Sequence, residues 1–96
     1  MESPNPILFY DEVQKTYQLE FVPSVDEGSD RILGRVRLYA FDLEGIADQI
    51  RVNQKDINPL ALIPSIPDTP ISRKERLQDY VPVSDSQVQE VINLLR

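Results

Sequence analysis

The sequence contains no histidine and no cysteine. Histidine has an unperturbed pKa near neutrality, and it is a frequent general base and the commonest metal ligand. Cysteine supplies thiolate nucleophiles, zinc ligands and disulfides. The side chains that remain for chemistry are carboxylates, hydroxyls, lysine and tyrosine, which build binding surfaces more readily than active sites. We therefore expect a protein that is not an enzyme and that holds no metal or cofactor.

Long apolar segments are also missing, and glycine is scarce. No apolar run approaches the roughly 18 residues that a membrane-spanning helix needs. The opening residues, MESPNP, have neither the positive charge nor the apolar stretch of a secretory signal. The three glycines cannot form a phosphate-binding loop. We expect no membrane contact and, because a chain without cysteine fits a reducing compartment, a cytoplasmic location.

The length of 96 residues suits a single domain with one hydrophobic core. The charge on this domain is uneven. Residues 1–30 contain seven acidic residues and one lysine, whereas residues 31–96 contain nine acidic and nine basic residues, so the first segment carries the whole net charge of −6. An acidic surface disfavours non-specific binding to nucleic-acid phosphates. A basic protein partner fits this charge better.

Side-chain alternation predicts an antiparallel β-meander of about three strands within residues 7–42. Residues 7–10 form a short apolar run, which is typical of a strand. Residues 16–22 and 33–41 alternate apolar and polar side chains, as strands with one buried face do. Together with the helices predicted below, this meander indicates the α+β fold class. Residues 1–6 are expected to be loose.

The second and third strands are expected to pair as a hairpin. In the register that we expect, Leu19 faces Val36 and Glu20 faces Arg35. This register keeps the apolar side chains on one face of the sheet and places opposite charges side by side on the other. A shift of one residue would mix the two faces.

The segment that follows the meander is ambiguous. Ile46, Ala47 and Ile50 have helical spacing, and Asp42 is a suitable N-cap. This pattern slightly favours a helix over residues 43–52, but the same residues could form a short strand.

Residues 59–70 contain four of the eight prolines, and three of them recur at every third position. This spacing is compatible with polyproline II, and it excludes both a helix and a central strand. The aliphatic side chains between the prolines favour an extended strap across the core of the domain. The alternative is a ligand for a proline-binding groove.

Two short helices are predicted at the C-terminal end, over residues 72–80 and 85–96. A capping-box pattern stands at the start of each helix: Ser72 with Glu75 for the first, and Ser84 with Gln87 for the second. The second helix carries an apolar stripe at helical spacing, formed by Val88, Val91, Ile92 and Leu95. A helix of this length needs tertiary contacts. The stripe therefore packs either on the sheet of its own chain or on a partner.

Two groups of residues are candidates for binding a protein partner. The first is the acidic loop with Asp26, Glu27 and Asp30, whose spacing does not match a calcium-binding EF-hand and which would attract a basic partner. The second is the apolar stripe of the last helix, if it is exposed.

An alternative face would bind nucleic acid. Arg35, Arg37, Tyr39 and Phe41 share one side of the predicted strand 33–41 and combine cations with stacking rings, as single-strand binders do. Residues 37–41 resemble part of the RNP1 motif of RNA-recognition domains, but Leu38 stands where that motif has glycine. In the competing interpretation, the arginines pair with Glu20 and other acids while the rings lie under a C-terminal helix.

We therefore expect a small acidic, non-catalytic protein that acts as an accessory or regulatory subunit through a protein–protein interface. The partner would be a basic protein or a larger complex, and a homo-oligomer is possible. The alternative is a nucleic-acid-binding regulator.

Overall fold

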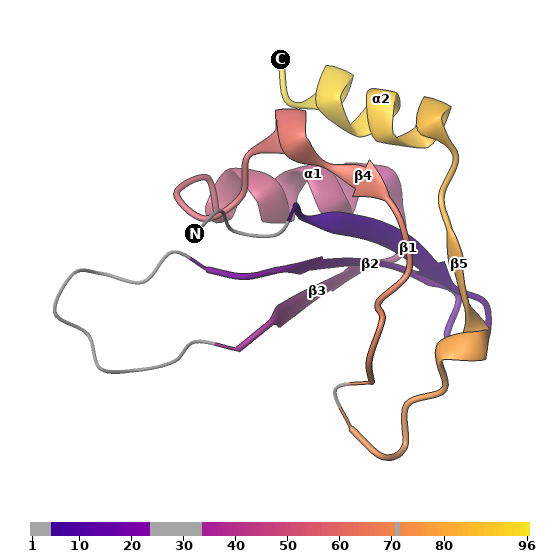
Figure 1. Ribbon diagram of the computed structural model, residues 1–96. Coiled ribbons are helices and arrows are strands. Elements are labelled where there is room, and N and C mark those ends of the chain that lie inside the picture. Colours follow the sequence, from indigo (N-terminus) through magenta and orange to yellow (C-terminus); the bar gives the residue numbers. More distant parts are fainter. Residues whose placement is uncertain (1–4, 24–33, 71) are drawn as a thin grey trace, which may run out of the picture.

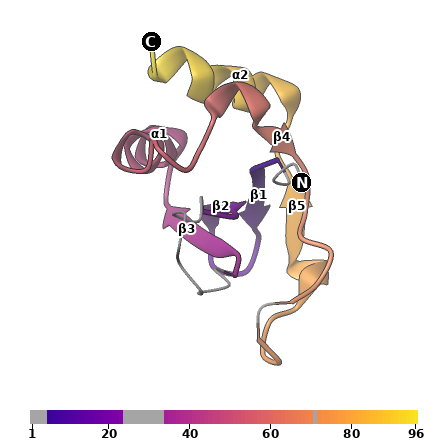
Figure 2. The ribbon, with the colours of Figure 1, turned by 60° about the vertical axis from the view of Figure 1, so that its left-hand side comes forward.

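The chain forms a small α+β domain in which a mixed five-stranded sheet carries both described α-helices on the same side (Figures 1 and 2). The computed structural model describes residues 5–23, 34–70 and 72–96. The strands are β1 (Ile7–Asp11), β2 (Thr16–Phe21), β3 (Val36–Ala40), β4 (Ile63–Pro64) and β5 (Tyr80–Pro82). The helices are α1 (Leu43–Val52) and α2 (Asp85–Leu94), with 3₁₀ turns at Pro59–Ala61 and Leu77–Asp79.

The antiparallel order β3-β2-β1 confirms a meander in the first half of the chain. Asp11 begins the turn between β1 and β2, because its carboxylate accepts hydrogen bonds from the backbone N–H groups of Val13 and Gln14 at 2.9 and 3.0 Å. The predicted count of about three strands is not confirmed for the whole sheet. On its other side β1 pairs with β4 in parallel and with β5 in antiparallel orientation.

The register between β2 and β3 differs from the expected one by two residues. Leu19 pairs with Leu38 rather than Val36, and Glu20 pairs with Arg37 rather than Arg35. A shift of two residues leaves every side chain on its original face, so alternation alone could not separate the two registers. The observed register brings Arg37 within 2.8 Å of the Glu20 carboxylate.

The hydrophobic core lies between the sheet and the two helices. Alternate residues of β1 and β2, such as Leu8 and Leu19, point toward α1, where Ile46 and Ile50 are buried. This confirms a helix rather than a strand over residues 43–52. Asp42 caps this helix by accepting a hydrogen bond from the Gly45 N–H at 2.7 Å.

Several polar side chains on the opposite face of the sheet are also buried. Gln18 and Glu20 are at most 5% exposed there, and Phe9 is completely buried. The segment between β4 and β5 is tied to this face through a hydrogen bond from Arg35 to Thr69 and an ion pair between Arg37 and Glu75.

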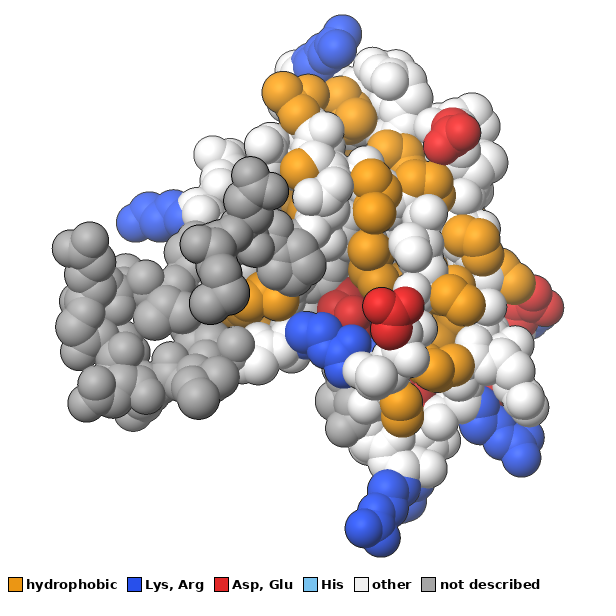
Figure 3. All heavy atoms as spheres, in the orientation of Figure 1, with side chains coloured by type: hydrophobic (Ala, Val, Ile, Leu, Met, Phe, Trp, Pro, Cys, Tyr) orange, Lys and Arg blue, Asp and Glu red, His pale blue; other side chains and the backbone are white. Residues whose placement is uncertain are grey.

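The proline-rich segment 59–70 is not a continuous extended strap. It starts with the 3₁₀ turn, because the Asn58 side chain accepts a hydrogen bond from the Leu60 N–H at 3.1 Å. Its aliphatic side chains do not all reach the core: Leu62 is buried, but Leu60 and Ile63 are 78% and 40% exposed. Figure 3 shows hydrophobic side chains gathered at the surface over β4 and the chain that follows it.

The helix predicted over residues 72–80 is wrong. Only a single 3₁₀ turn forms, at Leu77–Asp79, and Tyr80 already belongs to β5. The Glu75 side chain is engaged with Arg37, and the Asp79 carbonyl accepts a hydrogen bond from the Glu12 N–H at 3.0 Å. These contacts with the sheet replace the helical ones. The predicted C-terminal helix is confirmed as α2, with the full capping box of Ser84 and Gln87.

Candidate functional site

The structure places the predicted partner-binding residues in two different situations. Asp26, Glu27 and Asp30 lie outside the described residues. Val88 and Val91 are buried, and Ile92 and Leu95 pack against the same core. The apolar stripe of α2 therefore packs on its own domain, and it does not form an open surface.

Arg37 is enclosed rather than presented to a ligand. Its side chain is only 4% exposed and lies between the carboxylates of Glu20 and Glu75. Its guanidinium donates a hydrogen bond to the Tyr80 hydroxyl at 3.1 Å, and it lies 5.2 Å from the centre of the Phe9 ring. Burial opposes the charged form of Arg37, but the hydrogen bonds and charges of the two carboxylates outweigh it, so its pKa is raised.

The four residues of the proposed nucleic-acid face are therefore not equivalent. Arg35 donates hydrogen bonds to Glu20 at 3.4 Å and to the Thr69 hydroxyl at 2.6 Å, so both arginines pair within the domain. Tyr39 and Phe41 are 53% and 83% exposed, so they do not lie under a C-terminal helix. The structure leaves the two rings open to solvent, whereas it pairs both cations within the domain and buries only Arg37.

Phe41 stands between two open hollows. One hollow, with a volume of about 330 Å³, is lined by Tyr10, Tyr17, Phe41, Val81, Pro82, Val83 and Gln87. The other, with a volume of about 370 Å³, is lined by Tyr17, Phe41, Asp42, Leu43, Glu44, Glu90 and Leu94. Tyr17 and Phe41 belong to both hollows. We call the residues that line the two hollows the Phe41 surface.

Local structure forces Phe41 outward. Only Phe41 and Asp42 connect β3 to α1, and Asp42 is used as the helix cap. Gly45 allows α1 to approach the end of β3, since a Cβ at this position would lie 2.8 Å from the Cβ of Ala40. This tight connection leaves the Phe41 ring in solvent.

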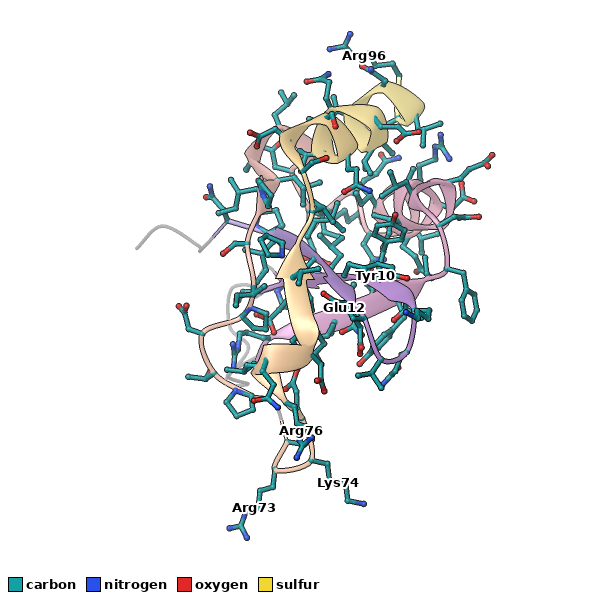
Figure 4. The ribbon with its side chains drawn as sticks, turned by 90° about the vertical axis from the view of Figure 1, so that its right-hand side faces the viewer. Tyr10, Glu12, Arg73, Lys74, Arg76 and Arg96 are labelled. Carbon is teal, nitrogen blue, oxygen red and sulfur yellow. The ribbon has the colours of Figure 1, made fainter. Side chains whose placement is uncertain are left out.

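The rings beside Phe41 are held in place. Tyr10 and Tyr17, from neighbouring strands, pack edge to face with their centres 4.9 Å apart. The Tyr17 hydroxyl accepts a hydrogen bond of 3.2 Å from the Gln87 side chain of α2. The Tyr10 hydroxyl has no hydrogen-bond partner within the part of the chain that the structure describes. Figure 4 shows Tyr10 midway along this side of the molecule, away from the exposed Arg73, Lys74 and Arg76 at the lower tip.

The charge around the second hollow is negative. Asp42, Glu44 and Glu90 line it, and among the described residues no lysine or arginine lines either hollow. Within the same described ranges, neither Glu44 nor Glu90 forms an ion pair. The Phe41 surface thus combines fixed aromatic rings with uncompensated carboxylates.

Sequence reasoning singled out Phe41 but missed Tyr10, Tyr17 and Gln87 as its neighbours. The two tyrosines flank the polar turn 11–15 on either side, and this placement could have indicated that their rings meet. Gln87 carried no such signal, because its position over Tyr17 depends on where α2 docks.

The comparisons with known proteins add no candidate site. No family model, no curated protein and no solved structure matches this chain. Within residues 5–23, 34–70 and 72–96, no helix has the length and apolar character needed to cross a membrane. In those ranges there is also no cluster of three or more acidic side chains arranged to hold a metal ion.

Proposed function

We propose that the protein is a small, non-catalytic protein-binding subunit and that its partner binds on the Phe41 surface. The observation that carries this proposal is the Phe41 ring, 83% exposed between two hollows whose other rings are fixed. Burying a phenylalanine side chain contributes roughly 1.5–3 kcal/mol. Large aromatic side chains at the centre of an interface also supply a disproportionate share of binding energy.

The charges of this surface support a protein partner rather than a nucleic acid. Binding to phosphates requires free Lys or Arg side chains. Arg35 and Arg37 are paired within the domain, and the residues beside Phe41 include Glu44 and Glu90. A basic or largely apolar protein surface would meet these carboxylates without repulsion. The absence of histidine and cysteine supports a role without catalysis.

A comparison of two variants in the native host tests this function. Phe41→Ala removes the exposed ring, whereas Val52→Ala truncates a side chain on α1 that is 82% exposed and lines neither hollow. Tagged wild-type protein and both variants are recovered from cells, and the accompanying proteins are measured by quantitative mass spectrometry. Circular dichroism first establishes that all three are folded.

We expect a specific partner to be reduced about tenfold or more with Phe41→Ala, as loss of an interface anchor predicts. Its recovery with Val52→Ala should match that of the wild type. Equal recovery of every protein with the wild type and both variants would contradict the proposal.

A further inference from the structure

The two hollows beside Phe41 differ in chemical character. The first is walled by the rings of Tyr10, Tyr17 and Phe41 and by Pro82. The second shares two of those rings but is bounded by Asp42, Glu44 and Glu90. A ligand that spans both hollows therefore meets an aromatic floor at one end and carboxylates at the other.

The aromatic hollow suits a backbone that is already extended. Segments in polyproline II conformation lose little entropy on binding, and aromatic-lined grooves recognise them for this reason. Their carbonyl groups make no internal hydrogen bonds. The Tyr10 hydroxyl, which has no hydrogen-bond partner among the described residues, can donate to such a carbonyl.

The two tyrosine rings are preorganised for this contact. Tyr17 is fixed by its edge-to-face contact with Tyr10 and by the hydrogen bond from Gln87. Prolines can pack on these rings without first displacing them, so little ordering of the surface opposes binding.

The acidic hollow determines which residue of the ligand, next to its prolines, is compatible with binding. Glu44 and Glu90 are exposed and form no ion pair within the described residues, so a Lys or Arg of the ligand would neutralise them. At an exposed site such a pair adds little affinity, but it orients the ligand and excludes an acidic one.

From these features we infer that the Phe41 surface binds an extended, proline-containing segment of a partner protein. The prolines pack on Tyr10, Tyr17 and Phe41, and a Lys or Arg next to them lies beside Glu44 and Glu90. This inference rests on the proposed function and specifies the chemistry of the partner.

Three synthetic peptides test it against the full chain. The first contains alternating prolines and alanines after one lysine, the second has glutamate in place of that lysine, and the third has alanine in place of every proline. Each is titrated into ¹⁵N-labelled protein, and backbone chemical shifts report both the location and the strength of binding.

We expect the lysine peptide to perturb residues around Tyr17 and Phe41 and to bind more tightly than the other two. Phe41→Ala should weaken it about tenfold, and Val52→Ala should leave it unchanged. The double variant Glu44→Gln, Glu90→Gln should weaken the lysine peptide about threefold at low salt but not the glutamate peptide.

Equal binding of the proline-free peptide, or no shift around Phe41 with any peptide, would overturn the inference. A dimer that depends on Phe41, measured by sedimentation, would also overturn it by showing that a second copy takes the surface. If the peptides fail but Phe41→Ala still loses its cellular partner, the proposed function stands and only the ligand chemistry is wrong.

Discussion

Arg37 and Tyr80 are 43 residues apart in the sequence, and the guanidinium of one donates a hydrogen bond of 3.1 Å to the hydroxyl of the other. The same guanidinium bridges Glu20 on β2 and Glu75 in the segment before β5. One arginine thereby ties the segment between β4 and β5 to the polar face of the sheet.

The substitution Arg37→Ala should be strongly destabilising. It would leave the carboxylates of Glu20 and Glu75, each with a side chain only 6% exposed, buried without their cation. Removing one partner of a buried ion pair costs about 3–5 kcal/mol. Urea denaturation followed by circular dichroism measures this loss as a lower midpoint.

Arg51→Ala is the matched control, because Arg51 is 45% exposed and both of its partners, the Asp48 carboxylate and the Leu94 carbonyl, lie at the surface. Surface pairs contribute about 0–1 kcal/mol, so this variant should unfold close to the wild type. Neutralising both acids in the triple variant Arg37→Met, Glu20→Gln, Glu75→Gln should restore part of the stability lost in Arg37→Ala. A midpoint for Arg37→Ala equal to that of Arg51→Ala would show that the buried cluster contributes no stability.

Tyr80 should make the protein sensitive to high pH. Burial, together with the hydrogen bond and charge of Glu75, raises the pKa of its hydroxyl above the ordinary value. An unfolded tyrosine ionises near pH 10, so the unfolded chain releases this proton first as the pH rises. The free energy of unfolding is therefore fully retained below about pH 10 and falls above it.

Urea denaturation at pH values from 8 to 11 tests this sensitivity. Tyr80→Phe should lose stability less steeply above pH 10 than the wild type, while Tyr39→Phe, which alters a ring that is 53% exposed, should keep the wild-type steepness. An identical decline in all three proteins would show that Tyr80 does not control the alkaline response.

Local signals predicted α1 and α2 correctly, because the helices that the capping residues indicate are also helices that pack against the core. Ser72 with Glu75 has the same capping pattern as Ser84 with Gln87, yet only the second pair begins a helix. The difference lies outside the segment. Glu75 is paired with Arg37, whereas the α2 stripe finds a core to pack against. Non-local contacts of this kind are invisible to a capping rule.

The candidate site was only partly predictable for the same reason. Alternation placed Arg37 and Tyr39 correctly on one face, but it could not show that Glu75 from a distant segment would enclose the arginine. Phe41 follows the last residue of β3, where the chain turns into α1, so strand alternation did not apply to it. Its exposure follows from the short connection to that helix.

The buried stripe of α2 should contribute to stability. Val91 of α2 is completely buried in the core. Val91→Ala should therefore lower the free energy of unfolding by about 2 kcal/mol, because it removes buried apolar surface and leaves a cavity. Glu90→Ala alters the adjacent exposed residue and should stay within about 0.5 kcal/mol of the wild type. Equal unfolding midpoints for the two variants would place this stripe outside the core.

The capping box of α2 should stabilise the N-terminal end of this helix through the Ser84 side chain. The Ser84 hydroxyl accepts from the Gln87 N–H at 3.2 Å, and the Gln87 side chain accepts from the Ser84 N–H at 3.0 Å. Ser84→Ala should therefore cost about 1 kcal/mol, whereas Ser84→Gly should cost only a few tenths, because glycine leaves the N-cap backbone open to water. Thermal unfolding measures both variants against the wild type, and a Ser84→Ala variant as stable as the wild type would show that the side-chain hydrogen bond does not stabilise this end of the helix.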